Sequence, residues 1–544
     1  MAQRILQVCM GDAGIVVGTL RFTAEAGREH SSFQYAQSWL EHSHRFAISP
    51  SLTLDDTQKF FHGDHFAGGG SPLPPPVADT TPDSWGREIL VKDARQRKQD
   101  VFTEADFLVA SDDFSRIGAL RFRDVASKAP FLACGAGGAH AIPPLLHLHQ
   151  ISMDVTRMEA GDPTAMALAR LREAGGSLGG ARPKCSILDT DGRLSIAKFT
   201  SRRDKLAVER AEVMTLRLAR LCGITTPESR IEMSEGLPVA IIERFDRATN
   251  QRRIPFISAQ TMLNASKATG GTYVDLADAI RQYSASANTE LHDLFRRIAF
   301  NILVSNTDDH LKNHGFLYDG KGGWRMAPAY DINPSPQRQK TLKTAIADPQ
   351  DPSASLDLLL EHAFYFEMSE DDAIRTMSHM AETIESHWEY LAKDTGMTRA
   401  EIHAYRDAFD HDAARFALAL SSPSSGNRSA AASLEQNFHD GLLPAPGAIE
   451  SMVGDDGTFT CTVRALVKDA NTNVFALVET DGKTFAVPVS DLDRDRLAIG
   501  HTATFRIAES SRYCAVMLPS SAATTEAGET PGPRPGTETR VPGF

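Results

Sequence analysis

The chain has 544 residues, of which 42% are hydrophobic and 23% charged, and its formal net charge is −13. This composition is typical of a globular protein with several domains, and it contains no apolar run of about eighteen residues that could cross a membrane. The negative charge disfavours a nucleic-acid surface spread over the whole protein, because phosphate binding needs clustered Lys and Arg. The six cysteines lack CxxC spacing, which argues against a zinc site and secreted disulfides. Residues 1–9 resemble a first strand more than a secretory signal, so we expect a cytoplasmic protein.

The first two predicted regions differ in their pattern of apolar residues. Residues 1–150 are predicted to form a mixed, β-rich region with long loops, and residues 151–255 to combine helices with antiparallel strands. A helix is expected to begin at Asp162-Pro163, because Asp is a common N-cap and Pro suits the first helical turn. The turn Asp191-Gly192 between alternating apolar residues predicts a β-hairpin, and a further helix is expected over 207–222.

Residues 256–420 are predicted to be largely helical. Between Thr289 and Leu303 the apolar residues repeat with the period of a helix, which predicts that one face is buried. This stripe consists of Leu291, Leu294, Phe295, Ile298 and Ile302. Further helices are expected over 371–391 and 399–420.

The carboxy-terminal part of the chain changes composition again. Residues 421–446 begin with a run of Ser, Pro and Gly and are predicted to be a linker. Residues 447–518 contain short β-type runs, which favour a small antiparallel barrel-like domain. Residues 519–544 contain few large apolar side chains and are predicted to be disordered.

The segment from Asn306 to Asn313 carries the strongest functional signal in the chain. Asp308 and Asn313 have the D-x-x-x-x-N spacing of a kinase catalytic loop, in which the Asp accepts a hydroxyl proton and the Asn binds Mg²⁺. Asp331, eighteen residues after Asn313, would supply a second oxygen ligand to such a hard cation. The pattern therefore predicts a phosphoryl-transfer centre with Asp308 as the general base.

Two neighbours of Asp308 allow other interpretations. Chemistry alone does not separate Asp308 from Asp309, since either carboxylate could act as a base. The spacing to Asn313 favours Asp308, and Asp309 is expected to face solvent or a basic neighbour. His310 and His314 could instead indicate a transition-metal site, but histidines at i and i+4 converge only on a helix, and a loop is predicted here.

Candidates for the remaining parts of a nucleotide site lie upstream. A glycine-rich run over 175–184 could bring backbone amides close to phosphate oxygens, although such runs are more often plain turns and this one lacks the Walker pattern. Lys198 lies in a predicted strand, where its ammonium either reaches into a cleft or extends to the surface. Glu212 on the next helix could pair with Lys198, and Glu209 is a competing partner.

The strand that ends in Glu243-Arg244-Phe245 also has two possible roles. It could form the hinge that hydrogen-bonds adenine through its backbone. It could equally be a structural strand that ends in a salt-bridged turn, Glu-Arg-Phe-Asp-Arg. Spacing alone does not decide between these roles.

Together, these motifs resemble those of the HipA-type serine/threonine kinases, the toxin halves of bacterial toxin–antitoxin pairs. The resemblance extends over about residues 10–420 and is most specific at 306–313 and at Pro328-Ala329-Tyr330-Asp331. Upstream, residues 81–87 and 118–122 look like the amino-terminal region of that family, which packs on the kinase core.

The resemblance implies an α+β, kinase-like fold with two lobes. The β-rich region 1–150 would pack on a phosphate-loop lobe, residues 151–255, and on a helical lobe, residues 256–420. Arg182-Pro183 and an additional glycine depart from the phosphate loop of the family, and the region after about residue 440 has no counterpart there.

By resemblance, the cofactors are ATP and Mg²⁺, Asp308 is the general base, and Asn313 and Asp331 hold the metal. The residues assigned to ATP binding are Ser177, Gly179, Gly180, Ala181, Lys184, Lys198, Glu212, Glu243, Phe245, His310 and Lys312. Ser177 is also a candidate for autophosphorylation, which would place negative charge where ATP phosphates bind and so eject the loop.

The resemblance further implies a protein substrate with a Ser or Thr acceptor and a helix-turn-helix antitoxin as partner. DNA would be contacted only through that antitoxin, and no membrane partner is expected. The leading hypothesis is a growth-arresting kinase toxin. The alternatives are a kinase-like binding scaffold or transcriptional co-repressor, and a small-molecule kinase, which would share the site and differ in the acceptor.

Overall fold

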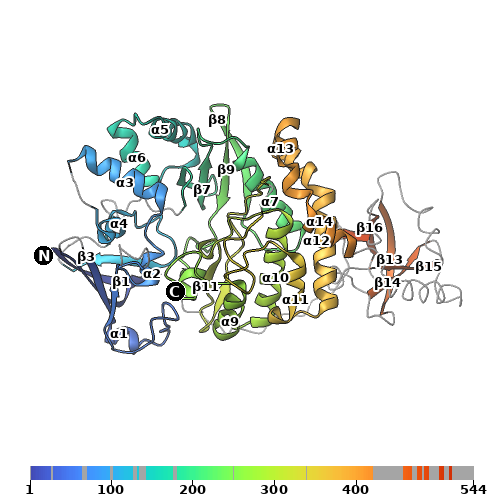
Figure 1. The fold of residues 1–544 in the computed structure, drawn as a ribbon, viewed down its shortest axis with the longest axis horizontal. Coiled ribbons are helices and arrows are strands. Elements are labelled where there is room, and N and C mark those ends of the chain that lie inside the picture. Colours follow the sequence, from blue (N-terminus) through green and yellow to red (C-terminus); the bar gives the residue numbers. More distant parts are fainter. Residues whose placement is uncertain are drawn as a thin grey trace, which may run out of the picture. The chain divides into compact units, whose positions relative to one another are not determined.

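Figure 1 shows the fold in a computed structural model of the chain. The structure describes residues 2–25, 28–63, 70–98, 102–125, 131–133, 142–175, 180–248, 250–337 and 340–420, and the backbone of strands between residues 458 and 517. The chain divides into two compact units between Ser421 and Ser422. Among the described residues, no helix is long and apolar enough to cross a membrane.

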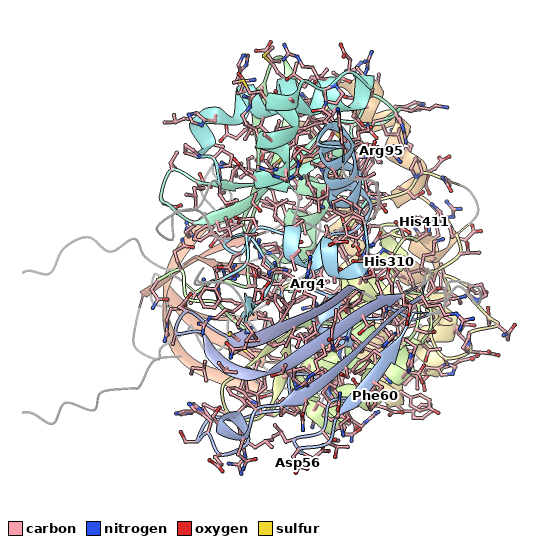
Figure 2. All side chains as sticks on the ribbon, turned by 90° about the vertical axis from the view of Figure 1, so that its left-hand side faces the viewer. Arg4, Asp56, Phe60, Arg95, His310 and His411 are labelled. Atoms are coloured by element: carbon pink, nitrogen blue, oxygen red, sulfur yellow. The ribbon has the colours of Figure 1, made fainter. Side chains whose placement is uncertain are left out.

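An antiparallel sheet dominates the amino-terminal region of the first unit, with the strand order β4-β3-β2-β1-β5. Its strands are β1 (Ala2–Met10), β2 (Ile15–Glu25), β3 (Arg28–Tyr35), β4 (Lys59–His62) and β5 (Leu120–Asp124). Along β1, Leu6 and Val8 are buried on one face, as expected for a sheet that covers a core. Phe60, on the edge strand β4, is 64% exposed at the rim of this sheet (Figure 2).

Helices accompany this sheet and were not predicted. They are α1 (Gln37–Leu40), α2 (Pro75–Ala78), α3 (Ser84–Gln96) and α4 (Glu104–Ala110). The longest, α3, does not pack only within its own region, because Trp85 and Ile89 join the hydrophobic core of the next part of the chain. The amino-terminal region and the following lobe therefore share a core.

A second antiparallel sheet, with the order β6-β7-β9-β8, forms the centre of the following lobe. Its strands are β6 (Lys184–Leu188), β7 (Leu194–Phe199), β8 (Ser229–Ser234) and β9 (Leu237–Glu243). The helices of this lobe are η2 (Leu145–His147), α5 (Leu148–Ala160), α6 (Ala165–Gly175) and α7 (Val208–Leu221). Figure 1 shows α5 and α6 on one side of these strands and α7 on the other. The hairpin and the helix over 207–222 are confirmed, whereas the helix expected from Asp162 begins at Ala165.

Helices make up most of residues 256–420, as predicted. They are α8 (Ala259–Met262), α9 (Tyr273–Tyr283), α10 (Ala287–Leu303), η3 (Leu311–Asn313), α11 (Leu356–Glu361), η4 (Ala363–Phe366), α12 (Glu370–Asp394), α13 (Arg399–Phe409) and α14 (Asp412–Leu420). A small antiparallel sheet in the order β10-β11-β12 lies among them. Its strands are β10 (Phe256–Ser258), β11 (Gly315–Tyr318) and β12 (Trp324–Met326).

The prediction for α10 is confirmed, whereas the prediction for the last helices is wrong. All the stripe residues of α10 are at most 2% exposed, which confirms the predicted buried face. The single helix predicted over 399–420 is wrong, because α13 and α14 are separate helices. The break is at Asp410, whose φ of −105° and ψ of 92° lie outside the helical region. Its carboxylate pairs with Arg415 of α14, on the far side of the break.

The second unit contains an antiparallel sheet in the order β15-β14-β13-β16-β17. Its strands are β13 (Thr458–Lys468), β14 (Val474–Thr480), β15 (Lys483–Pro488), β16 (Thr502–Ile507) and β17 (Cys514–Met517). The predicted β-type runs are therefore strands, and closure of the sheet into a barrel stays a prediction. The predicted linker over 421–446 and the predicted disordered tail over 519–544 lie outside the described residues.

Truncation of a core phenylalanine tests the burial of α10. Phe295 is fully buried and its ring lies 5.8 Å from that of Phe366 in η4. We expect Phe295→Ala to reduce the free energy of unfolding by roughly 3–5 kcal/mol, because both apolar contact and packing are lost. Urea unfolding of the full chain measures this change. Phe60→Ala is the matched control, and an equal loss in both variants would contradict the assignment of the core.

Candidate active site

The segment after α10 is a loop, and hydrogen bonds between Asn306 at its start and Asn301 in α10 fix its first residues. The backbone N–H of Asn306 donates to the carbonyl of Asn301 at 2.7 Å, and the side chain of Asn306 donates to Asn301 Oδ1 at 3.0 Å. Ser305 has a φ of 57°, in the left-handed region, which turns the chain out of the helix. The loop then continues into η3, whose N-cap is His310.

The structure separates the two adjacent aspartates. Asp308 is exposed, whereas Asp309 is buried. The carboxylate of Asp309 accepts hydrogen bonds from the Tyr273 hydroxyl, from Asn301 Nδ2 at 2.6 Å and from His314 Nε2 at 2.8 Å. Burial alone would raise the pKa of Asp309, but His314 and these hydrogen bonds hold it below its usual value.

This arrangement answers the open question about Asp309. The expectation that it faces solvent is wrong, because the fold turns its side chain inward under the loop, and the alternative of a basic neighbour is correct. Asp308 is left exposed at the outer side of the loop, where an acceptor hydroxyl could approach it. Among the described residues, no group of three or more His, Cys, Asp and Glu side chains is arranged to hold a metal ion.

Lys198 lies between two carboxylates at the centre of the site. Its ammonium is 2.5 Å from Glu212 Oε1 on α7 and 2.8 Å from Asp331 Oδ1. The predicted pair with Glu212 is present, and the competing partner Glu209 instead pairs with Arg182. The contact with Asp331, across 133 residues, was not predicted.

The charges of this cluster depend on one another. Burial by itself would lower the pKa of Lys198, but Asp331 and Glu212 raise it above the usual value, so the side chain stays cationic. Burial likewise opposes ionisation of Asp331, and Lys198 with Lys184 nevertheless holds its pKa well below the usual range. Burial dominates at Glu212, whose pKa is raised in spite of Lys198. Lys198 and Asp331 are therefore the charged centre of the cluster.

Asp331 and Asn313 provide oxygen donors suited to Mg²⁺. Asn313 is buried, and its Nδ2 donates to the carbonyl of Asp308 at 3.1 Å. Asp331 has a φ of 58°, an unusual conformation for a non-glycine residue and one found at functional sites. Beside it, Asn333 Oδ1 is buried without a hydrogen-bond partner among the described residues. A carboxylate with the unpartnered amide oxygen of Asn333 beside it fits a hard cation that retains some of its waters.

The predicted phosphate loop is described only from Gly180 onwards, and Ser177 and Gly179 lie outside the described residues. Gly180 has a φ of 86°, and its backbone N–H donates to Asp83 Oδ2 at 2.9 Å. Ala181, the next residue, is exposed. Lys184 faces Lys198 across the β6–β7 pair, and burial together with Lys198 lowers the pKa of Lys184 to about 8. Two lysines therefore extend toward the same region of the site.

The two remaining predicted ligands of the catalytic loop have different surroundings. Lys312 forms an ion pair with Asp83 at 2.7 Å, and its carbonyl accepts a hydrogen bond from the Tyr330 hydroxyl at 2.8 Å. The bond from Tyr330 ties η3 to the segment that carries Asp331. His310 Nδ1 is buried and has no hydrogen-bond partner among the described residues.

The strand end at Glu243 forms the salt-bridged turn that was one of the two alternatives. Glu243 pairs with Arg193 at 2.7 Å, and the ring of Phe245 lies 5.2 Å from that of Tyr330. Arg244 and Arg247 both pair with the buried Asp246 at 2.6 Å. These contacts are made by side chains. The backbone N–H groups of Glu243 and Arg244 donate to the carbonyls of Glu228 and Leu194, so Phe245 is the residue of this strand end whose backbone stays a candidate for the adenine hinge.

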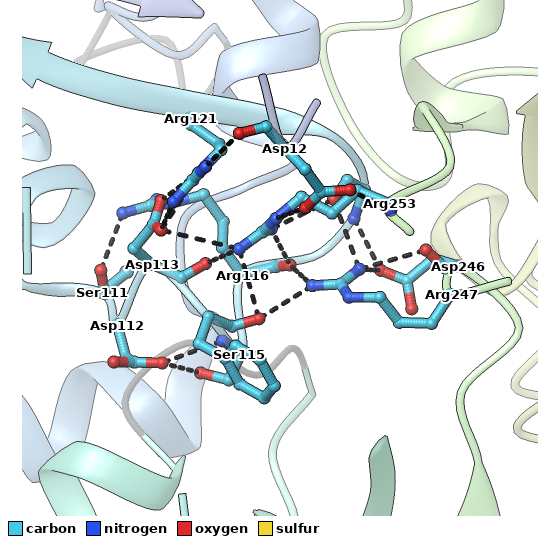
Figure 3. Close-up of polar contacts among 12 residues, drawn as sticks. Asp12, Ser111, Asp112, Asp113, Ser115, Arg116, Arg121, Asp246, Arg247 and Arg253 are labelled. Atoms are coloured by element: carbon cyan, nitrogen blue, oxygen red, sulfur yellow. Dashed lines mark hydrogen bonds and ion pairs between the residues drawn. The ribbon is translucent and has the colours of Figure 1, made fainter. Parts of the chain in front are cut away.

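The Asp246 turn also joins the amino-terminal region to the site (Figure 3). Asp246 Oδ2 accepts a hydrogen bond from the backbone N–H of Gly118 at 2.7 Å, and Arg247 donates to the carbonyl of Arg116 at 2.9 Å. Arg253 donates to the same group of backbone carbonyls. These residues form a structural joint, because the buried Asp246 carboxylate is paired with the buried side chains of two arginines, Arg244 and Arg247.

Sequence reasoning missed several residues that support the site. Asp83, Asn333 and the network of Tyr273 and Asn301 were not assigned to the site. Asp83 carried one signal, because it lies in the segment 81–87 that resembles the family's amino-terminal region. Its contact with Lys312, across 229 residues, required the fold.

The chain matches known families over most of its first unit. Residues 6–122 match the HipA N-terminal domain, and residues 176–388 match the HipA-like C-terminal domain. The HipA toxin of Shewanella oneidensis, named a serine/threonine-protein kinase, is 24% identical over 389 residues, which are 64% of this chain and 80% of that protein. This chain belongs to the HipA-type family.

Other relatives are more distant or matched over a shorter length. A putative kinase of Sinorhizobium fredii is 29% identical over 189 residues, and the match spans 31% of this chain and about half of that protein, 45%. A solved HipA from Shewanella oneidensis, in complex with HipB and operator DNA, has a TM-score of 0.55 at 17% identity. The similarity covers 74% of this chain and 96% of that one, and it shows a shared fold.

Removal of the Asp246 carboxylate tests the joint. We expect Asp246→Ala to lower the stability of the first unit by roughly 3–5 kcal/mol, because Arg244 and Arg247 would be left buried without their counter-charge. Asp191→Ala, which breaks an exposed pair with Arg193, should cause little change and serves as the control. Denaturant unfolding measures both, and a loss no larger than that of the control would contradict a structural role for Asp246.

Proposed function

We propose that this chain is an ATP- and Mg²⁺-dependent protein serine/threonine kinase of HipA type. The observation that carries the proposal is the Lys198 cluster, in which a buried cation contacts both Glu212 and Asp331. In kinases such a lysine contacts ATP phosphates, and the carboxylate beside it holds Mg²⁺. The exposed Asp308 completes the set.

Each residue has a role in this proposal. Bound ATP would supply the phosphoryl group, and Mg²⁺ would neutralise the negative charge that develops during its transfer. Asn313 and Asp331 would hold the metal, and Lys198 would bind phosphate oxygens. Glu212 keeps the Lys198 ammonium in place, because the two are in direct contact. Asp308 would accept the proton of the acceptor hydroxyl as the hydroxyl oxygen bonds to the γ-phosphorus of ATP. The bond from that phosphorus to the bridging oxygen of the β-phosphate breaks in the same transfer, and ADP leaves.

Further ATP contacts are proposed around this centre. Glu243 and Phe245 would present the backbone hinge to adenine, next to the ring of Tyr330. The phosphate loop with Ser177, Gly179, Gly180 and Ala181 would cover the phosphates, together with Lys184, His310 and Lys312. Autophosphorylation of Ser177 remains part of this proposal, since added negative charge there would oppose phosphate binding.

The biological role proposed is that of a growth-arresting toxin with a helix-turn-helix antitoxin. Support comes from the relative named as a HipA toxin and from the solved relative in complex with HipB and operator DNA. The net charge of −13 also favours contact with DNA through a partner over direct contact.

Substitution of Asp308 tests the assigned base. We expect Asp308→Ala to lower γ-phosphate transfer from radiolabelled ATP to a protein acceptor by about 10²- to 10⁴-fold, the usual contribution of a general base. Thermal unfolding should be unchanged, because the Asp308 side chain is exposed. Asp278→Ala, at an exposed aspartate of α9, is the control. Transfer at the wild-type rate by Asp308→Ala would exclude the mechanism.

Ligand-induced stabilisation distinguishes a kinase from a binding scaffold. We expect Mg·ATP to raise the melting temperature of the wild-type chain, since a ligand present at 100 times its dissociation constant adds about 2.7 kcal/mol to stability. The shift should persist in Asp308→Ala and be lost in Lys198→Ala, each compared with its own ligand-free state. A wild-type chain without any shift would instead favour the scaffold or co-repressor.

A further inference from the structure

Asp83 connects three segments that are far apart in the sequence. It immediately precedes α3 in the amino-terminal region. One carboxylate oxygen accepts the backbone N–H of Gly180 in the phosphate loop at 2.9 Å, and the other contacts the ammonium of Lys312 in the catalytic loop at 2.7 Å. A single side chain thereby joins both loops of the proposed nucleotide site.

The local role expected of Asp83 is not the one it fulfils. Asp83 occupies the N-cap position of α3, with φ of −87° and ψ of −162°, and aspartates at this position usually accept an N–H from the first turn of their own helix. Here the side chain makes no capping hydrogen bond. Both oxygens contact Gly180 and Lys312 instead, so these two interactions replace the capping hydrogen bond of α3.

The backbone around Asp83 is firmly anchored. Trp85 is buried, its Nε1 donates to the carbonyl of Lys184 at 3.0 Å, and its backbone N–H donates to the carbonyl of Gly180 at 3.2 Å. Arg87 donates to the carbonyl of Pro82 at 2.8 Å. The carboxylate of Asp83 is therefore presented from a rigid element, as a group that positions other residues must be.

The partners of Asp83 lead to the charged centre of the site. A β-carbon added to Gly180 would meet the Lys184 ammonium, so the two lie in immediate contact. Lys184 faces Lys198 across the sheet, and Lys198 contacts Asp331. A lysine ammonium has three N–H donors, and the contact with Asp83 needs only one of them. Lys312 can therefore bind Asp83 and a phosphate oxygen at the same time.

We propose that Asp83 is a positioning residue that holds Lys312 and the phosphate loop at Gly180 in register for the terminal phosphoryl group of ATP. This inference rests on the proposed kinase function. Asp83 does not touch the reacting atoms itself, and it acts through Lys312. The amino-terminal region thus contributes directly to the geometry of phosphoryl transfer.

The isosteric variant Asp83→Asn tests this role. Its amide can still accept the Gly180 N–H but cannot also attract Lys312. We expect kcat for phosphoryl transfer to fall about tenfold or more, as for other misplaced catalytic groups. The dissociation constant for Mg·ADP should stay within about twofold of wild type, because ADP lacks the terminal phosphate, whereas that for Mg·AMPPNP should rise. Asp83→Glu should restore part of kcat.

Two controls separate positioning from folding. Glu88→Gln removes an exposed carboxylate of the same helix, which pairs only with Lys92 at 2.8 Å in the described residues, and should leave kcat unchanged. In a Lys312→Ala background, Asp83→Asn should have no further effect on kcat, because the residue through which it acts is already lost. Thermal unfolding without ligand should change little in Asp83→Asn, since partly exposed ion pairs contribute little to stability.

Distinct results would overturn the inference. An unchanged kcat in Asp83→Asn, beside an active wild type, refutes the role of Asp83 and leaves the proposed function intact. A higher kcat with tighter Mg·AMPPNP binding would show that the carboxylate competes with phosphate. An equal loss of Mg·ADP and Mg·AMPPNP affinity with a lower melting temperature would show a purely structural role. A wild type without Asp308-dependent transfer refutes the proposed function, and with it this inference.

Discussion

The contact of Lys198 with Glu212 and Asp331 is the interaction on which the rest of the site depends. The Lys198 ammonium and the Glu212 carboxylate are buried and the Asp331 carboxylate is partly buried, so all three lose hydration, and close mutual contact compensates for this loss. The contact holds together β7, α7 and the segment after β12. Each of these elements must therefore be packed accurately for any one of the three charges to be tolerated.

The amino-terminal region supports this centre at two places. At one, Asp246 accepts the Gly118 N–H and pairs with two arginines, which fixes the end of β9. At the other, Trp85 and Asp83 hold the phosphate loop at Gly180. Since α3 also shares a core with the β6–β9 sheet, the region is structurally continuous with the lobe that carries Lys198. The amino-terminal family match and the site are thus parts of one structure.

The fold also gives residues of the same type different surroundings and roles. Asp308 and Asp309 are adjacent in the chain, yet one is exposed and the other is buried against Tyr273, Asn301 and His314. The buried carboxylate anchors the loop from which the exposed one projects. Lys184 and Lys198 are likewise two residues of one type in different surroundings. Direct contact with carboxylates raises the pKa of Lys198, whereas burial and the charge of Lys198 lower the pKa of Lys184.

The sequence by itself determined the features that depend on near neighbours. Periodicity predicted the buried face of α10, and short spacing predicted the Lys198–Glu212 pair, because a strand followed directly by a helix brings such residues together. Only the tertiary structure decided the contacts of Asp331 with Lys198, of Asp83 with Lys312, and the inward turn of Asp309. The first two contacts join residues more than a hundred positions apart, which meet only through the packing of whole elements. The turn of Asp309 depends on Tyr273 of a separate helix, α9, which no local pattern encodes either. The break at Asp410 was also missed; there the backbone leaves the helical region, and the Asp410 carboxylate pairs with Arg415 of the next helix.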